Sequence, residues 1–502
     1  MTAIEPGAGE WRRLSTRMLL IHPVQELLRA WPLLLGLVVA GSAGGHGSWW
    51  SLIATGLVIL GGLLRWFTTT YRVTAEQVQV RKGLLRRQVL TVPRDRIRTV
   101  DVTAHALHRS LGLAKVEIGT GRTDRKNEGV KLDALNATEA ARLREELLHR
   151  ANTGAPAASS AVRAAEPPRE TLLARMRPEW LRYGPFTLTG FVTVGVIAGV
   201  VWRSLNEAHV DPRRIGALSA LADRFQRTPL AVDVLVVVVA LLVVVAVAST
   251  LGYLLAFHGF RLTRGSAGTL HVTRGLITTR SITIEERRLR GVEFSEPLLL
   301  RAVGAARCIA ITTGLRVGRG AERGGSLLLP PAPCPEALRV AGAVMRNDAP
   351  FTAPLTGHGP RATRRRFSRA LGATLLILVA ALALWGVGAV PAWMWQAAIV
   401  PVPLAALVAA DRAHALGHAV VNGALVGRRG SLVRRRSVLS CEGIIGWNLR
   451  RSFFQRRSGL ATLVATTAAG RQRVEVQDVP LNEALRVAEE ALPGLLTPFL
   501  EP

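Results

Sequence analysis

Lysines and acidic residues are scarce in this chain of 502 residues. Only four lysines occur, and 35 Asp and Glu residues stand against 64 Lys and Arg residues, so arginine carries almost all of the formal net charge of +29. Such an excess is compatible with nucleic acid or an anionic membrane surface as a partner. We favour a simpler explanation, which combines an arginine-biased composition with the basic cytoplasmic loops of membrane proteins.

Cysteine is also rare, which excludes a disulfide framework. Cys308, Cys334 and Cys441 are far apart in the sequence and form no Cys-x-x-Cys pair. This pattern indicates neither a structural zinc site nor a secreted disulfide scaffold. It fits modules that are kept in a reducing cytoplasm.

The motifs of the common enzyme classes are missing. The chain has no P-loop, no G-x-S-x-G elbow, no H-E-x-x-H helix and no paired carboxylates in a recognisable setting. His414 and His418 are four residues apart, but no carboxylate or cysteine completes a metal site, and we interpret them as interfacial residues at the end of a membrane span. The sequence therefore predicts a non-enzymatic protein without a cofactor or a bound metal.

Long apolar runs are abundant, since 49% of the residues are hydrophobic. Six runs are long enough to cross about 30 Å of hydrocarbon as helices. They lie at 31–45 with the preceding leucines, 49–67, 183–202, 234–257, 370–390 and 392–410. Because these runs contain almost no charged residues, a substrate-coupled transporter is disfavoured. A transporter or export component built from the six spans nevertheless remains the second hypothesis.

The distribution of basic residues predicts the orientation in the membrane. The short loops Gly44–Ser48 and Gly386–Trp393 contain no Lys or Arg. Five arginines precede the fifth span: Arg361, Arg364, Arg365, Arg366 and Arg369. Basic residues concentrate on the cytoplasmic side, so we expect a multi-pass protein of the cell membrane with both termini in the cytoplasm.

A repeated spacing of glycines divides the rest of the chain into three modules. Two glycines stand 29 residues apart in each copy, and an arginine precedes the second glycine by three residues. The glycine pairs are Gly83 and Gly112, Gly275 and Gly304, and Gly430 and Gly459, and the arginines are Arg109, Arg301 and Arg456. A spacing that is kept three times without an insertion indicates one folded module in triplicate.

Within each module the residue pattern is that of β-strands followed by one helix. Residues 77–80 and 89–92 alternate β-branched and polar residues around a hairpin at Gly83. Helices are expected after Asn136 and over two copies of the sequence EALRVA, at 336–341 and 483–488. The simplest fold with this order is a small antiparallel β domain closed by a C-terminal helix.

These motifs resemble a known family. In the first copy, Tyr71-x-x-Thr74, the Gly83 hairpin, Pro93-Arg-x-x-Ile97 and Leu107-x-Arg109-x-x-Gly112 are similar to the bacterial PH-like domain of the membrane family typified by the Bacillus YdbT proteins. The resemblance implies PH-like split barrels. It also implies association with a second copy or with a shorter PH-like membrane protein, and a role in envelope stress or antimicrobial resistance.

The predicted architecture is thus a membrane α-helical protein with six transmembrane helices and three PH-like domains. Residues 1–29 form a cytoplasmic arm, 30–67 the first membrane hairpin and 69–150 the first domain. A linker at 151–178 leads to a membrane pair with an external loop at 183–257 and to the second domain at 258–346. A basic linker at 347–369 precedes the third hairpin at 370–410 and the third domain at 411–502.

The predicted binding residues are the basic residues of two hairpins. They are Arg81, Lys82, Arg86 and Arg87 in the first module, and Arg428, Arg429, Arg434, Arg435 and Arg436 in the third. Clusters of this kind near a bilayer attract anionic lipids, although a solvated hairpin without a ligand is an open alternative. Few aromatic residues lie among these arginines, so we expect no nucleic acid partner. The turn arginines could bind a phosphate, but we favour a structural role in which they pin the turn by hydrogen bonds to backbone carbonyls.

Overall fold

The computed structural model describes five main stretches of the chain. They are residues 11–15, 69–119, 130–143, 170–207, and 229–495, with gaps at 14, 75, 83–87, 95–96, 98, 141, 188, 266–267 and 314–325. The predicted first membrane hairpin at 30–67, Arg86 and Arg87 lie outside the described residues. The chain forms two compact units, residues 1–283 and 284–502, and each is described by itself.

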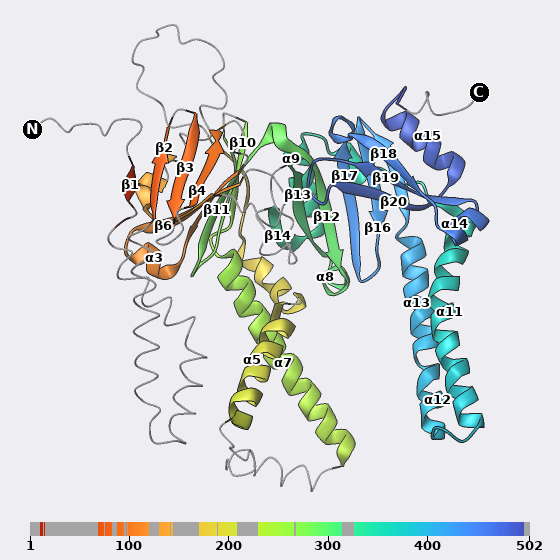
Figure 1. Ribbon diagram of the computed structural model, residues 1–502. Helices are drawn as coiled ribbons and strands as arrows, with labels where there is room; N and C mark the ends of the chain where they lie inside the picture. The colour runs from red at the N-terminus through yellow and green to blue at the C-terminus, as the bar shows by residue number, and fades with distance from the viewer. Residues whose placement is uncertain are drawn as a thin grey trace, which may run out of the picture. The chain divides into compact units, whose positions relative to one another are not determined.

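Three helices among the described residues are long and apolar enough to cross a membrane. They are α7 (Leu230–Phe257), α11 (Gly359–Gly386) and the continuous stretch Ala392–His414, which contains α12 (Ala392–Ile399) and α13 (Pro401–His414). In the second unit, α11 and α13 run side by side, as Figure 1 shows. These candidate membrane helices coincide with three of the six predicted spans.

The count of six spans is not supported by the described residues. The predicted third span corresponds to α5 (Thr189–Glu207), which packs along α7 but is not among the three qualifying helices. Its apolar run is short and ends in polar residues such as Arg203 and Glu207. At Gly190 the two helices are so close that an added Cβ would lie 1.9 Å from the Ser249 hydroxyl oxygen.

The first unit contains a four-stranded and a seven-stranded antiparallel sheet. The first is β1 (Arg12–Arg13), β2 (Thr70–Val73), β3 (Gln77–Lys82) and β4 (Gln88–Pro93), in that order. The second has the order β7 (Val130–Asn136), β6 (Leu113–Gly119), β5 (Thr99–Ala104), β11 (Thr279–Glu285), β10 (Thr269–Arg274), β9 (Arg261–Gly265) and β8 (Thr171–Arg175). Besides α5 and α7, the described helices of this unit include α3 (Ala106–Ser110) and the 3-10 helix η3 (Pro178–Phe186).

The second unit contains a six-stranded and a three-stranded sheet. The first has the order β14 (Leu327–Pro333), β13 (Ala305–Thr312), β12 (Leu289–Pro297), β17 (Val433–Ser440), β16 (Ala424–Arg429) and β15 (Gly417–Val421). The second is β18 (Gly446–Arg450), β19 (Leu460–Thr466) and β20 (Arg473–Pro480). Besides α11, α12 and α13, its described helices include α8 (Leu298–Ala302), α9 (Cys334–Met345), α10 (Ala349–Thr352), α14 (Phe453–Arg457) and α15 (Leu481–Ala491).

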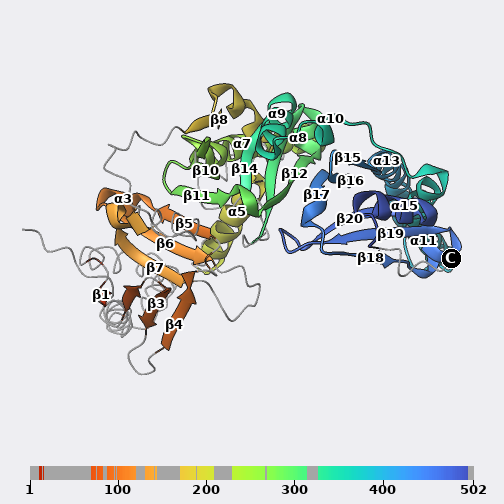
Figure 2. The same cartoon turned by 90° about the horizontal axis from the view of Figure 1, so that it is seen from above.

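The first and third modules each enclose one hydrophobic core between two sheets and a helix. In the first, buried residues of β3, β6 and β7 pack with Ala140 and Leu143 of the helical segment that follows. In the third, Ala484, Val487 and Ala488 of α15 face the core. The repeated sequence EALRVA is thereby explained, because its small and apolar positions share one helical face. Figure 2 shows α15 lying over β19 and β20.

The repeated glycines have a conformational cause. Gly112, Gly304 and Gly459 adopt φ of 69°, 68° and 64°, a left-handed region that favours glycine. Gly275 and Gly430 have φ of 110° and 102°, and an added Cβ would lie 2.0 and 2.1 Å from a backbone oxygen. The sequence repeat therefore marks backbone positions that other residues cannot occupy without strain.

Consecutive modules share a continuous sheet, which the sequence did not predict. Strand β5 of the first module pairs with β11 of the second, with Val102 opposite Ser281. Strand β12 of the second module pairs with β17 of the third, with Phe294 opposite Arg436. We call each of these strand pairings between consecutive modules a joint. Val102 is equivalent to Phe294 in the repeat, and Ser281 is equivalent to Arg436, so both joints have the same register.

In each module, a residue that precedes the predicted membrane segment pairs with a residue that follows it. Arg12 pairs with Tyr71, Leu172 with Thr263, and Thr356 forms an isolated bridge with His418. Tyr71, Thr263 and His418 are equivalent repeat positions, each 12 residues before the hairpin glycine. The segments predicted as a cytoplasmic arm (1–29) and as linkers (151–178 and 347–369) thus each contribute a residue to a sheet. Their paired stretches are too short to show a strand pattern.

Candidate functional site: an arginine cleft at the base of α11

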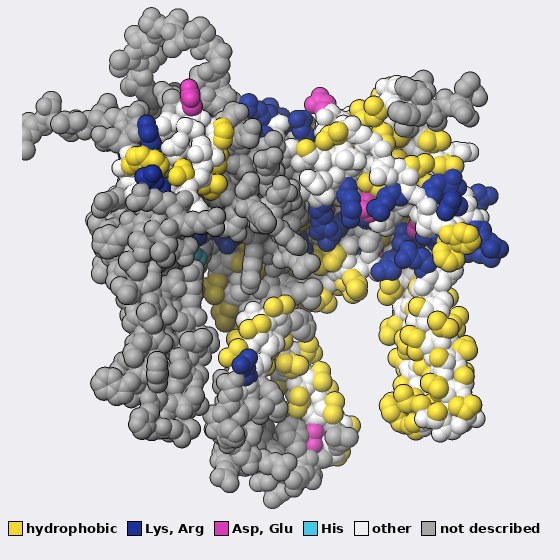
Figure 3. All heavy atoms as spheres, viewed as in Figure 1, with side chains coloured by type: hydrophobic (Ala, Val, Ile, Leu, Met, Phe, Trp, Pro, Cys, Tyr) yellow, Lys and Arg dark blue, Asp and Glu magenta, His cyan; other side chains and the backbone are white. Residues whose placement is uncertain are grey.

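Two adjoining clefts lie on the third module where α11 begins. The larger has a volume of about 690 Å³ and the smaller about 450 Å³, and they share Arg366, Arg369 and Gln477. The remaining basic residues of the larger cleft are Arg365, Arg450 and Arg451, and those of the smaller are Arg412, Arg429 and Arg435. Figure 3 shows dark blue Lys and Arg side chains gathered directly above the largely apolar surface of the α11–α13 pair.

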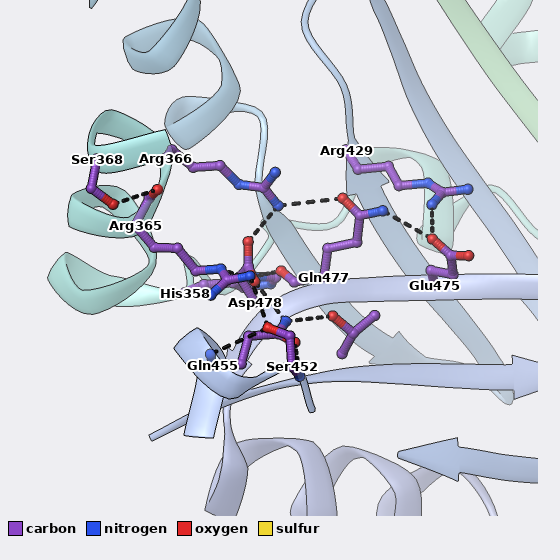
Figure 4. Close-up of polar contacts among 11 residues, drawn as sticks. His358, Arg365, Arg366, Ser368, Arg429, Ser452, Gln455, Glu475, Gln477 and Asp478 are labelled. Atoms are coloured by element: carbon purple, nitrogen blue, oxygen red, sulfur yellow. Dashed lines mark hydrogen bonds and ion pairs between the residues drawn. The ribbon is translucent and has the colours of Figure 1, made fainter. Parts of the chain in front are cut away.

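Asp478 organises the larger cleft. Its side chain is buried and its oxygens lie 3.0 Å from Arg365 Nε and 2.6 Å from Arg366 Nη2. The Gln455 amide donates a further hydrogen bond of 2.8 Å to Asp478 Oδ1. Figure 4 shows both arginines reaching from α11 toward Asp478 and Gln477. One carboxylate therefore holds two guanidinium groups at the end of a membrane helix.

Positive charge in the larger cleft exceeds the negative charge that offsets it. Five arginines line it, against the carboxylates Glu475 and Asp478. Arg365 Nη1 is buried and has no hydrogen-bond partner among the described residues. Arg369, Arg450 and Arg451 are exposed, and no ion pair joins them to a carboxylate of the described residues. The cleft can therefore accept an anion.

Both charge types in the cleft are held ionised. Burial lowers the pKa of Arg366 and the Asp478 charge opposes this, yet a guanidinium stays protonated at physiological pH. Burial acts to raise the pKa of Glu475, but the Gln477 amide with Arg429 and Arg473 lowers it overall. Arg366 and Glu475 thus provide opposite fixed charges in the cleft.

The predicted hairpin arginines of the third module serve mainly internal contacts. Arg428 Nε donates to the Ala415 carbonyl at 3.2 Å, and Arg436 Nη2 to the Ala353 carbonyl at 2.8 Å. The other three pair with carboxylates: Arg429 with Glu475, Arg434 with Asp411 at 2.8 Å, and Arg435 with Glu293 at 3.5 Å. Arg429 and Arg435 also line the smaller cleft. Arg428, Arg434 and Arg436 line neither cleft.

The first-module cluster is described only in part. The Arg81 guanidinium lies 5.5 Å from the centre of the Trp11 ring, a cation–π distance that ties β3 to the β1 region. Lys82 ends β3, and Arg86 and Arg87 lie outside the described residues. The structure therefore leaves binding by this hairpin a prediction.

The sequence pattern around these residues predicts the orientation of the chain but not the cleft. Arg365, Arg366 and Arg369 indicate the cytoplasmic side of the fifth span, and no motif marks Arg450 and Arg451. The available signal was five arginines within nine residues next to an apolar run. Asp478 could not be found this way, since its role depends on α11 and β20 meeting in the fold.

The interfacial interpretation of His418 is wrong. Its side chain is buried in the third module, with Nδ1 at 3.1 Å from His358 Nε2 and Nε2 at 3.3 Å from Glu483. His358 Nδ1 lies 2.7 Å from the Gln477 carbonyl and must donate to it, so His358 Nε2 accepts from His418. Burial, together with the neighbouring His418, lowers the pKa of His358 to about 4.

Acidification is expected to destabilise the third module through His358. The unfolded chain takes up a proton near pH 6.5, but the folded state resists it down to about pH 4, so stability is complete above this window and falls as the pH decreases through it. We expect a loss of about 1–3 kcal/mol. Thermal unfolding of the detergent-solubilised protein at several pH values measures it.

The variant His358→Gln should flatten this pH dependence, because its side chain does not titrate. His414→Gln is the matched control, since His414 is exposed in the last turn of α13. Equal pH dependence in wild type and His358→Gln would contradict the assignment.

Arg109 and Arg301 bond backbone carbonyls, as predicted, but these carbonyls belong to the following module and not to the turn that contains the arginine. Arg109 Nη1 donates to the Leu276 carbonyl at 3.1 Å, and Arg301 Nη1 to the Ser431 carbonyl at 3.3 Å. Leu276 and Ser431 each directly follow the hairpin glycine of the next module. These arginines thus fasten the joints between modules.

Comparison with known proteins agrees with the repeated fold. The bacterial PH domain model matches three times, at residues 30–151, 215–347 and 368–493, which together make up most of the chain. The UPF0699 transmembrane protein YdbT of Bacillus subtilis is 21% identical over 266 residues, 51% of this chain and 52% of YdbT, so the chain spans about half of that relative's length. No solved structure matches. The chain is a membrane protein that belongs to the bacterial PH domain family.

Proposed function

We propose that this protein is a non-enzymatic, multi-pass protein of the cell membrane whose PH-like modules form a binding and assembly platform at the cytoplasmic face. Six spans and cytoplasmic termini are part of the proposal. The observation that carries it is the arginine cleft, where five arginines outnumber two carboxylates at the end of α11. Its ligand would be the phosphate of an anionic lipid headgroup.

The position of the cleft suits a lipid better than a free anion. Arg365, Arg366 and Arg369 belong to the same helix as the apolar run that follows them. A lipid in the adjacent leaflet would hold its phosphate at the level where such a helix leaves the hydrocarbon. Basic pockets beside membrane helices bind anionic headgroups for this reason.

The chemistry of the cleft also suits a phosphate. A guanidinium group offers a planar fork of donors that matches two phosphate oxygens. Asp478 fixes Arg365 and Arg366, while the buried Arg365 Nη1 keeps a donor without a hydrogen-bond partner among the described residues. Exposed Arg369 and Arg412 add charge at the rims of the two clefts.

Lipid binding is expected to fall in Arg369→Gln/Arg412→Gln. Each basic residue near a bilayer contributes about 1 kcal/mol, so the double variant should bind roughly 30-fold more weakly. The full chain in nanodiscs of neutral lipid would be titrated with short-chain phosphatidylglycerol that carries a fluorescent label, at low salt.

The matched control is Arg175→Gln/Arg177→Gln, which removes the same charge from two exposed positions next to the α5–α7 pair. It should bind like wild type. No preference of the wild-type protein for phosphatidylglycerol over phosphatidylcholine, or an equal loss in both double variants, would count against the cleft.

A further inference from the structure

The two joints inside the chain define one repeated way of connecting modules. In each, a strand of one module pairs antiparallel with the second hairpin strand of the next module, in the same register. In each, the turn arginine of the first module donates to the carbonyl after the hairpin glycine of the next. The joint is therefore a defined interface with two independent features.

Among the described residues, β4 and β18 are strands of these same two kinds, and each lacks a paired strand on one side. Strand β4 of the first module corresponds to β11 and β17, and it ends its sheet. Strand β18 of the third module corresponds to β5 and β12, and it also ends its sheet. Within the described residues, the outer edges of β4 and β18 are thus the two halves of a joint that has not formed.

The exposed side chains on these edges support this reading. Val89 and Leu90 of β4 are 53% and 37% exposed, and Leu449 of β18 is 40% exposed. In the formed joints, Ile282 of β11 is the counterpart of Leu90 and is 1% exposed, and Phe294 of β12 is the counterpart of Leu449 and is 4% exposed. Apolar side chains on an open strand edge mark a surface for strand pairing.

Arg456 is the turn arginine of the third module and supplies the second feature. It lies in α14 at the position of Arg109 and Arg301, and its side chain is exposed. It makes no side-chain hydrogen bond or ion pair within the described residues, whereas Arg301 makes contacts with both Ser431 and Asp411.

We infer that β18 of one copy of this chain pairs with β4 of a second copy, in the register of the two internal joints. This places Leu449 opposite Val89 and Arg450 opposite Gln88, and gives Arg456 the position that Arg109 and Arg301 have in the two internal joints. The inference deepens the assembly role in the proposed function and does not depend on the lipid cleft. Because the two surfaces differ, the contact is heterologous and generates a ring or a line of copies in the membrane.

The salt dependence separates this contact from lipid binding. Between the described strands β18 and β4, the same register brings no two charged side chains opposite one another, because Leu449 faces Val89 and Arg450 faces the uncharged Gln88. The pairing should therefore change little with ionic strength, whereas binding of an anionic headgroup should weaken at high ionic strength. A failure of one proposal would thus leave the other intact.

The test is disulfide crosslinking between two differently tagged full-length chains in membranes. One chain carries Val89→Cys and the other Leu449→Cys, and mild oxidation should give a product that contains both tags. A fivefold or greater excess over Val89→Cys paired with Leu432→Cys is expected, since Leu432 is 62% exposed but lies off the edge. Adding Arg456→Ala to the chain that carries Leu449→Cys should lower the yield of this product severalfold.

The internal joint supplies the positive control. Val102 and Ser281 are the opposed pair of the internal joint that corresponds to Leu449 and Val89, so Val102→Cys/Ser281→Cys in one chain should crosslink within that chain. If this control reacts and the two tagged chains give no mixed product, the inference is overturned. It is equally overturned if Val89→Cys/Leu449→Cys in a single chain gives only an internal crosslink, because the two edges would then join within one copy.

Discussion

Asp478→Asn is expected to destabilise the third module by about 3–5 kcal/mol, the range for removing one partner of a buried ion pair. The substitution leaves Arg365 and Arg366, both largely buried, without their shared carboxylate. Asp478 is itself buried and has a φ of 56°, a conformation that asparagine tolerates well. The variant therefore removes charge without adding backbone strain.

The measurement is thermal or denaturant unfolding of the detergent-solubilised protein, with intrinsic fluorescence as the signal. Glu442→Gln is the control, because Glu442 is exposed and forms no ion pair within the described residues. Its effect should stay within about 0.5 kcal/mol. Similar stability of Asp478→Asn and wild type would show that the two arginines do not need the carboxylate. The anion site would then lack the support that we assign to it.

Local patterns in the sequence predicted the module and its membrane helices. The spacing from Gly275 to Gly304 and from Gly430 to Gly459 was informative because these positions have positive φ in the structure. The long uncharged run in α7 also predicted its structure well, since a segment of this length and hydropathy is typical of a membrane-spanning helix. Such features depend on residues that are close in the chain.

Features that depend on distant residues were not predictable. The alternation in β5 shows that it is a strand, but nothing in it identifies β11, more than 170 residues later, as a neighbour. Strand β1 consists of two arginines, too few to show any period. The candidate site needed α11, β18 and β20 to converge, so the sequence indicated its arginines without Asp478 or Gln477.

Gly291→Ala is expected to weaken the joint between the second and third modules, by about 1–3 kcal/mol or more. An added Cβ would lie 2.1 Å from the Val438 carbonyl oxygen and 3.1 Å from Leu439 Cα on the paired strand. Both atoms belong to the backbone, so the clash can be relieved only by moving β12 away from β17. Hydrogen exchange at the amides of β17, together with the unfolding midpoint, measures the effect.

Gly446→Ala is the matched control, because Gly446 occupies the equivalent position in β18, where an added Cβ would meet nothing within 4 Å. The corresponding residue of the first module is Thr99, which already carries a side chain. The requirement for glycine thus belongs to the β12–β17 joint and not to the module. If both variants lost the same stability, the cost would come from the strand itself. Faster exchange confined to β12 and β17 in Gly291→Ala would instead localise the cost to the shared sheet, as the close approach at Val438 requires.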